Sequence, residues 1–105
     1  TIGEQSPPNL LHILINNFVH ESVGGQSTSA KYVDIKSLVS SSNYKNVKSV
    51  HKISEIKNNL QLLLSKKGPS FLEFVVQPGS RNSLGRPSTK PIDNKKDFMK
   101  FLSKK

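Results

Sequence analysis

An apolar run over residues 10–15 stops abruptly at two asparagines, Asn16 and Asn17. A short apolar run that ends in turn residues is typical of a strand buried on both faces of a parallel sheet. In such sheets, ligands bind beyond the carboxyl ends of the strands. Asn is a poor strand former and a good source of oxygen ligands, so the pair indicates ligand or metal contact. A plainer interpretation is that both residues only end the strand and cap a turn.

The segment around this strand adds two expectations. His12 lies inside the apolar run, and we predict a packed core histidine with its hydrogen bonds satisfied, not a ligand. Residues 17–30 form a long loop that contains Gly24 and Gly25. Loops of this length are usually functional or mobile. The glycine pair permits positive φ and a close backbone approach to a ligand, although by itself it is a weak phosphate-loop signal.

The length of 105 residues allows one small domain, and a hydrophobic fraction of 33% implies a modest core. Cysteine is absent, which excludes a disulfide framework and a thiolate zinc site and fits a reducing compartment, so we expect a cytoplasmic protein. No apolar run is long enough to span a bilayer, and we expect no membrane partner. The start has neither a signal peptide nor an initiator Met, and we expect a piece of a longer protein whose upstream part is missing.

The net charge of +9 attracts polyanions, which include nucleic acids and phosphorylated ligands. Most of this charge is lysine dispersed along the chain, and Arg81 and Arg86 are the only arginines. Dispersed lysines are usually a solvated surface, and no nucleic-acid recognition motif is present. We therefore expect no nucleic-acid partner and keep a basic nucleic-acid-binding module as an alternative function.

Helices and strands alternate along the rest of the chain. Asp34 is a good N-cap for a helix that runs into the early forties. A short strand over residues 47–50 precedes a second helix, with Ser54 as its N-cap and Gly68-Pro69 beyond its end. The apolar stripe of this second helix consists of Ile53, Ile56, Leu60, Leu63 and Leu64. The fold class is therefore predicted as α/β, an open parallel sheet of few strands with flanking helices.

A third strand is predicted over residues 70–77, and a last helix from Asp93 or Asn94 to about Leu102. We expect this helix to pack through its large apolar side chains, Phe98, Phe101 and Leu102.

Two loops leave carboxyl strand ends and should meet at one edge of the sheet. Residues 17–30 bring amide oxygens with His20, Glu21 and Gln26, and residues 78–91 bring Arg81 and Arg86. Oxygen ligands suit Mg²⁺, and guanidinium groups suit phosphate or phosphonate. The alternative for these charged side chains is a solvated loop surface.

A strand followed by Asn16-Asn17 resembles the second half of the thiamine diphosphate signature, in which a Gly-Asp-Gly element precedes an Asn-Asn element. By matching positions, the resemblance implies that the Asn17 side chain and the Val19 carbonyl are ligands of the Mg²⁺ that holds the cofactor's diphosphate. The Gly-Asp-Gly element would lie upstream of Thr1. The first residues resemble the end of the helix between the two elements.

Three further blocks narrow the resemblance: His20-Glu21-Ser22-Val23-Gly24-Gly25-Gln26-Ser27-Thr28, Pro78-Gly79-Ser80-Arg81 and Leu84-Gly85-Arg86-Pro87. They are similar to the C-terminal part of the phosphonopyruvate decarboxylase family, and the sulfopyruvate decarboxylases share the first block less closely. The resemblance covers nearly the whole chain. It implies a partial parallel sheet, the C-terminal part of a thiamine diphosphate-binding domain over residues 1–105.

The implied reaction is the decarboxylation of 3-phosphonopyruvate to phosphonoacetaldehyde and CO₂, with thiamine diphosphate and Mg²⁺ as cofactors. The implied cofactor-binding residues are Asn16, Asn17, Val19, Gly24 and Gly25. We place His20 and Gln26 at the border of the reaction pocket, and charge alone places Arg81 or Arg86 against the substrate phosphonate.

Three expectations concern the whole protein. The resemblance implies a homo-oligomer in full-length form, because family members bind the cofactor between two domains, usually from different subunits. The fragment alone should be inert and of marginal stability, with an unpaired sheet edge. The alternatives are a sulfopyruvate decarboxylase and a degenerate paralogue that only binds a partner.

Overall fold

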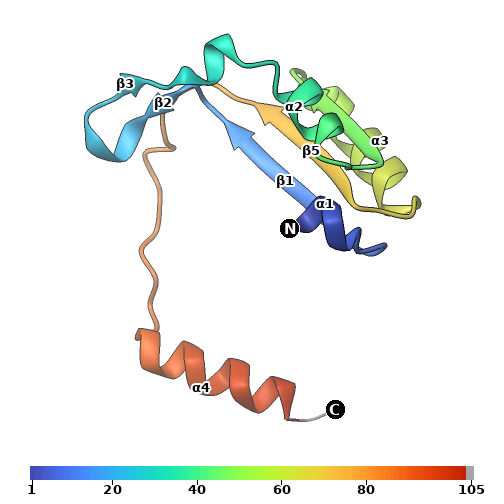
Figure 1. The fold of residues 1–105 in the computed structure, drawn as a ribbon. Coiled ribbons are helices and arrows are strands. Elements are labelled where there is room, and N and C mark those ends of the chain that lie inside the picture. The colour runs from blue at the N-terminus through green and yellow to red at the C-terminus, as the bar shows by residue number, and fades with distance from the viewer. Residues whose placement is uncertain (104–105) are drawn as a thin grey trace.

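The computed structural model describes residues 1–103 and confirms the α/β class. Its centre is a parallel sheet in the order β1-β5-β4, formed by β1 (Leu11–Asn16), β5 (Ser70–Val75) and β4 (Asn46–Val50) (Figure 1). The flanking helices are α2 (Ile35–Ser41), which contacts β4, and α3 (Ile53–Leu64), which contacts β4 and β5. The unit β4-α3-β5 is the expected strand-helix-strand repeat, so the sheet is organised as the alternation predicts.

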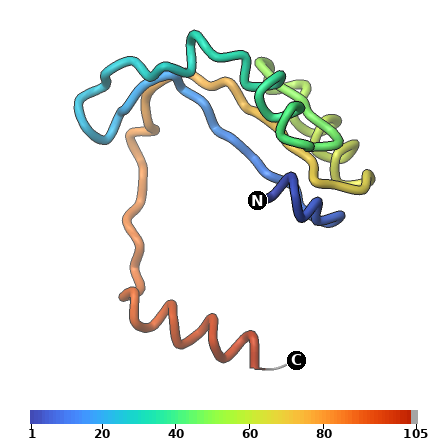
Figure 2. Tube along the Cα trace, viewed as in Figure 1, coloured from blue at the N-terminus to red at the C-terminus, as the bar shows by residue number. Residues whose placement is uncertain are grey.

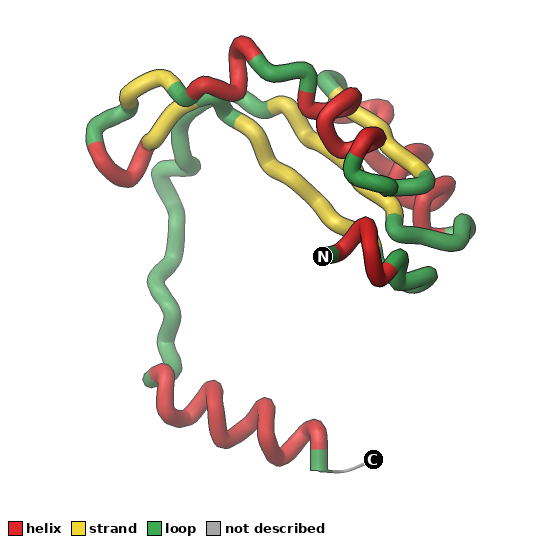
Figure 3. The backbone as a smooth tube through the Cα atoms, in the orientation of Figure 1, coloured by secondary structure: helices red, strands yellow, loops and turns green. Residues whose placement is uncertain are grey.

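Residues 17–30 are more ordered than an irregular loop (Figure 3). They contain an antiparallel hairpin of β2 (Val19–His20) and β3 (Gln26–Ser27), with a 3₁₀ turn over Glu21–Val23 between its strands. A second 3₁₀ turn, Ser29–Tyr32, leads towards α2. The chain begins with a short helix, α1 (Ile2–Gln5).

The hydrophobic core lies between the sheet and α3. Leu72 of β5, Val50 of β4 and Leu63 of α3 are buried against one another, and Leu11, Ile56, Leu60 and Phe74 pack around them. Side chains alternate between the two faces of a strand. Leu72 and Phe74 therefore face α3, whereas Phe71 and Glu73 lie on the opposite face.

His12 is exposed, so the prediction of a core histidine is wrong about its burial. Its hydrogen bonding was predicted correctly, because Nδ1 lies 2.9 Å from the Tyr44 hydroxyl. Both rings also contact Phe71, at centroid distances of 5.1 Å for His12 and 5.9 Å for Tyr44. The histidine is thus part of a small aromatic cluster on the sheet surface, together with Tyr44 and Phe71.

The prediction that the first strand is buried on both faces is also wrong. β1 is an edge strand, and Ile15 is 69% exposed. Ile13 and Ile15 are on the same face as Leu11, but α3 reaches only far enough to cover Leu11. The unpaired edge itself was expected.

Helix α3 begins at Ile53 with Lys52 as its N-cap, so the predicted cap at Ser54 is wrong. Ile53 is 89% exposed and does not belong to the buried stripe, because it occupies the first helical position. The helix ends at Leu64, before the predicted Gly68-Pro69 stop. Gly68 is instead buried beside β1, and its amide donates to the Pro8 carbonyl at 2.6 Å.

The last helix, α4 (Pro91–Leu102), exists as predicted but does not pack as predicted. Phe98, Phe101 and Leu102 are all exposed. An extended segment leads from β5, which ends at Val75, to this helix, which stands away from the sheet (Figure 2). The radius of gyration is accordingly 17.0 Å, against about 13 Å for a compact domain of this length. Lys104 and Lys105, the last of the dispersed lysines, lie outside the described residues.

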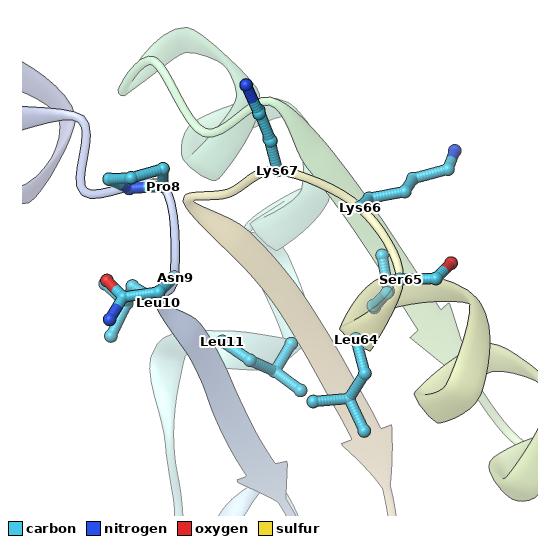
Figure 4. A pocket seen from close by; sticks show the side chains of 9 residues that line it. Pro8, Asn9, Leu10, Leu11, Leu64, Ser65, Lys66 and Lys67 are labelled. Carbon is cyan, nitrogen blue, oxygen red and sulfur yellow. The ribbon is translucent and has the colours of Figure 1, made fainter.

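A groove of about 290 Å³ runs between the start of β1 and the end of α3 (Figure 4). Leu10, Leu11 and Leu64 line it, with Lys66 and Lys67 at its rim. It lies at the amino end of the strands, opposite the predicted site. Within residues 1–103, no helix has the length and apolar character needed to cross a membrane.

Candidate functional site

The two asparagines at the end of β1 fold the chain back by the same local contact. Asn16 Oδ1 accepts a hydrogen bond from the Phe18 amide, and Asn17 Oδ1 accepts one from the Val19 amide, both at 3.1 Å. Side-chain oxygens that bind the backbone two residues ahead define Asx turns. Phe18, which follows the two asparagines, has a φ of 60°, a left-handed conformation that is unusual for a bulky residue. The strand end is therefore a sharp, tightly held turn.

Asn16 is directed into the protein. Its side chain is 8% exposed, and its Nδ2 donates to Glu73 Oε1 at 2.8 Å. The other carboxylate oxygen of Glu73 accepts a hydrogen bond from the Ser49 hydroxyl at 2.8 Å. These contacts form a buried polar ladder across β1, β5 and β4. Asn16 thus supports the turn from within the sheet.

Asn17 is half-buried at the sheet edge. Its Nδ2 donates to Glu21 Oε2 at 2.6 Å, so both ends of the amide are engaged. An amide oxygen has two lone pairs, and the Val19 amide uses one of them. Asn17 Oδ1 therefore retains capacity for one more partner.

The hairpin that follows brings His20 and Gln26 together, since they are directly opposite partners of β2 and β3. Directly opposite residues of an antiparallel pair share one face. Gly24 and Gly25 have φ values of 116° and 76°, so the expected positive φ is confirmed at both. A Cβ on Gly24 would lie 2.9 Å from Gln26 Nε2, because the Gln26 side chain lies over this glycine.

The carbonyl of Val19 is on the side of the hairpin away from β3. The neighbouring carbonyls of Phe18 and His20 accept hydrogen bonds from the amides of Thr28 and Gly25, at 2.8 and 2.9 Å. Carbonyls along an extended strand alternate in direction, so that of Val19 points the other way. Asn17 Oδ1 and this carbonyl are neutral oxygen donors of the kind that Mg²⁺ accepts, and in this respect the donor set fits the ion.

The second predicted loop lies beside the first, as expected from strands whose carboxyl ends share one edge. The Gly79 amide donates to Glu21 Oε1, and the Val76 amide donates to the Asn16 carbonyl at 2.9 Å. Arg81 follows two residues after Gly79, whereas Arg86 lies farther along the extended segment that leads to α4. Both arginines are exposed.

A second cavity, of about 230 Å³, lies beside the turn at the same end of the sheet. Phe18, Asp34, Ser49, His51 and Glu73 are among its lining residues. Asp34 caps α2, where its carboxylate accepts hydrogen bonds from the Ser37 hydroxyl at 2.7 Å and the Ser37 amide at 3.1 Å. These two bonds lower the pKa of Asp34 below its ordinary value of 3.8.

Sequence reasoning missed Glu73 and treated Glu21 only as one oxygen among several. An acid within the apolar run Phe71-Leu72-Glu73-Phe74 is the signal for a buried partner, but the sequence does not say which one. Within residues 1–103, no group of three or more His, Asp or Glu side chains could hold a metal ion.

The chain is similar to two curated proteins, both named phosphonopyruvate decarboxylase. It is 31% identical to the protein from Streptomyces viridochromogenes and 30% identical to that from Streptomyces hygroscopicus, each over 103 residues. Each alignment covers 98% of this chain but only 26% of the relative, so the chain spans about a quarter of these proteins' length. No family model matches the chain. The resemblance drawn from its separate motifs is thus confirmed: along nearly its whole length, this chain is similar to a quarter of a phosphonopyruvate decarboxylase.

Proposed function

We propose that this chain is part of an enzyme that decarboxylates 3-phosphonopyruvate to phosphonoacetaldehyde and CO₂, with thiamine diphosphate and Mg²⁺ as cofactors. One observation carries the proposal beyond the similarity: Asn17 Oδ1 and the Val19 carbonyl lie in one held turn at the carboxyl end of a parallel strand. Ligands of open parallel sheets bind at such strand ends. The chain would form the C-terminal part of the cofactor's diphosphate-binding domain.

In this proposal, Asn17 and Val19 supply two oxygen ligands to Mg²⁺. Both are neutral, so they would help to hold the ion without adding negative charge that opposes the diphosphate. Gly25 leaves room for close approach of the cofactor, because no heavy atom lies within 4 Å of the position of its Cβ, whereas Gln26 lies over Gly24. Asn16 supports the turn through Glu73. When bound, thiamine diphosphate would supply the electron sink that accepts the electron pair left on the substrate as CO₂ departs.

His20 and Gln26 border the reaction pocket in this proposal. Their positions as opposite residues of β2 and β3 place them on one face of the hairpin, directly after the Asn17 turn. An imidazole and an amide can each donate and accept hydrogen bonds, so the pair can orient a keto acid.

Arg81 or Arg86 binds the phosphonate, because a guanidinium group makes paired, charge-assisted hydrogen bonds to such an anion. The anchoring of Gly79 at the Asn17 turn favours Arg81, which is two residues away. Both Arg81→Ala and Arg86→Ala should be made in the complete protein that carries this chain. We expect replacement of the residue that binds the phosphonate to raise the KM for phosphonopyruvate more than about 10-fold. Lys57→Ala on α3 is the control, and unchanged KM in both arginine variants would remove this assignment.

The proposed function is tested by CO₂ release from the complete protein with Mg²⁺ and thiamine diphosphate. Phosphonopyruvate and sulfopyruvate should be compared, since both present a keto acid with an anionic head. We expect turnover of phosphonopyruvate that fails without either cofactor and falls at least about 100-fold in Asn17→Ala. Asn58→Ala, an exposed position of α3, is the matched control. Preferred turnover of sulfopyruvate, or turnover independent of Asn17, would contradict the proposal.

We propose further that the complete enzyme is a homo-oligomer and that the 105-residue chain is inactive alone, since the residues described provide only two ligands for the ion. Full turnover by the isolated chain would contradict this part.

A further inference from the structure

Glu21 joins the two loops at the carboxyl edge of the sheet. Its Oε2 accepts a hydrogen bond from Asn17 Nδ2 at 2.6 Å, and its Oε1 accepts one from the Gly79 amide. Gly79 is 58 residues away in the sequence. The side chain is exposed, and an exposed carboxylate is usually satisfied by water. Here, instead, one oxygen accepts a hydrogen bond from the first loop and the other oxygen accepts one from the second loop.

The bond to Asn17 decides which end of that amide faces which partner. With Nδ2 on the Glu21 carboxylate, Asn17 Oδ1 faces the Val19 amide. A reversed amide would direct Nδ2 at the Val19 N–H and its oxygen at a carboxylate, so that donors would face donors and acceptors would face acceptors. Glu21 therefore fixes the orientation that leaves the Asn17 oxygen available as a ligand.

The bond to Gly79 fixes the start of the second loop at the same point. Gly79 has a φ of 115°, and no heavy atom lies within 4 Å of the position where its Cβ would be. The Gly79 amide is thus held by the Glu21 carboxylate, while the space at the glycine's Cβ position is open. Because Arg81 follows two residues later, the same carboxylate ties an arginine to the asparagine turn.

We propose that Glu21 is a positioning residue: it aims the Asn17 oxygen towards Mg²⁺ and anchors the loop of Arg81 beside it. This inference rests on the proposed function, because it assumes that Asn17 is a metal ligand. Groups that orient a metal ligand are worth about 10- to 100-fold in metal affinity.

The test uses Mn²⁺ as the probe, with thiamine diphosphate present, and measures its affinity for the complete protein by electron paramagnetic resonance. Glu21→Gln can accept only one of the two hydrogen bonds, and Glu21→Ala can accept neither. We expect Mn²⁺ to bind about 10-fold more weakly in both variants. Glu4→Gln removes the same charge at an exposed site in α1 and should leave the affinity unchanged. Unchanged affinity in both Glu21 variants would overturn the proposal.

A double-mutant cycle separates positioning from a direct effect of the carboxylate charge on the ion. If Glu21 acts through Asn17, the effect of Glu21→Gln should disappear in an Asn17→Ala background. An equal loss of Mn²⁺ affinity in both backgrounds would overturn the positioning role and indicate direct attraction of the metal.

Amide hydrogen exchange tests whether Glu21 anchors the loop of Arg81, and it needs no metal or cofactor. In the Glu21→Ala protein, the Gly79 amide should exchange at least about 10-fold faster than in the wild-type protein, whereas the Val76 amide, held by the Asn16 carbonyl, should not change. An unchanged rate at Gly79 would overturn the anchoring role. Failure of the wild-type protein to bind Mn²⁺ would instead contradict the proposed function and leave the exchange result as a separate test of Glu21.

Discussion

At the scale of single residues, the two asparagines make the same kind of turn contact but differ in what surrounds them. Each amide oxygen caps the backbone two residues ahead, and each amide nitrogen donates to a glutamate. The difference is burial: Glu73 holds Asn16 inside the sheet, and Glu21 holds Asn17 at its surface. Only the outer asparagine is therefore accessible from the surface, while the inner one stabilises the turn from within the sheet.

Glu73 gives the residue-scale prediction. Glu73→Ala would leave the Asn16 amide and the Ser49 hydroxyl without their buried acceptor. We expect it to lower the free energy of unfolding of this chain by about 3 kcal/mol, measured by urea denaturation. Glu73→Gln should cost less than about 1 kcal/mol, because its oxygen can accept from Asn16 while its amide donates to Ser49. Equal stability of the alanine variant and the wild-type chain would contradict the buried ladder.

Neither partner of the asparagine pair could be predicted from the sequence. The turn chemistry of Asn16-Asn17 is a local property, and the interpretation that the pair ends the strand and caps a turn is confirmed. The contacts with Glu73 and Gly79 join residues 57 and 58 positions apart, so they depend on strand order. An exposed Glu21 in a polar loop has no pattern that distinguishes a clamp from a solvated charge.

At the scale of elements, local signals decided which predictions were confirmed. The Asp34 cap and the start of α2 at Ile35 follow from residues that contact each other within one turn. The burial of β1 depends on which neighbours cover it, and here the prediction was wrong. A continuous apolar run indicates two covered faces, but the run alone does not say whether this chain provides both covers.

The cap of α2 should make part of the chain's stability dependent on pH. Two hydrogen bonds from Ser37 hold the pKa of Asp34 below 3.8 in the folded chain. The stabilisation is therefore present above the unfolded pKa of about 3.8 and is lost as the pH falls through the lower folded value. We expect Asp34→Ala to lower the Tm at pH 7 and to have little effect near pH 2. A loss of Tm that is the same at both pH values would show that the carboxylate charge is not involved.

Gly68 lies just before β5, where the packing should not tolerate an added side chain. A Cβ there would lie 2.6 Å from the Leu10 carbonyl oxygen and 3.0 Å from the Ser70 nitrogen, both of the backbone. We expect Gly68→Ala to cost about 2 to 3 kcal/mol of unfolding free energy, because neither atom can move without shifting β1 or β5. Gly85→Ala, where no atom lies within 4 Å, should change it by less than about 0.5 kcal/mol. Similar values for the two variants would contradict this packing.

At the scale of the whole molecule, one face of the sheet is covered by α3 over β4 and β5 and is open along β1 beyond Leu11. Helix α3 covers the core, while Ile13 and Ile15 of β1 and the groove beside Leu10 and Leu11 remain accessible. The turn at Asn17 is nevertheless held from three sides, by Asn16 at the end of β1, by Val19 and Glu21 of the following hairpin, and by Gly79 after β5. The candidate site thus depends on the sheet's carboxyl edge alone and not on the parts of the molecule that stand open.

Helix α4 should accordingly contribute almost nothing to the stability of the sheet. Its apolar side chains, Phe98, Met99, Phe101 and Leu102, are exposed, and a 12-residue helix that buries none of its residues is marginal in water. We expect removal of residues 91–105 to change the unfolding free energy by less than about 0.5 kcal/mol and to leave the denaturant slope unchanged. Unfolding can be measured by the near-ultraviolet signal of Tyr44, which lies in an aromatic cluster. Removal of residues 1–5 is the contrasting control, because Asn43 Nδ2 donates to the Gly3 carbonyl at 2.6 Å and this contact would be lost. A clear loss of stability on removal of α4 would mean that the helix packs on the sheet, and would contradict the exposure of its apolar side chains.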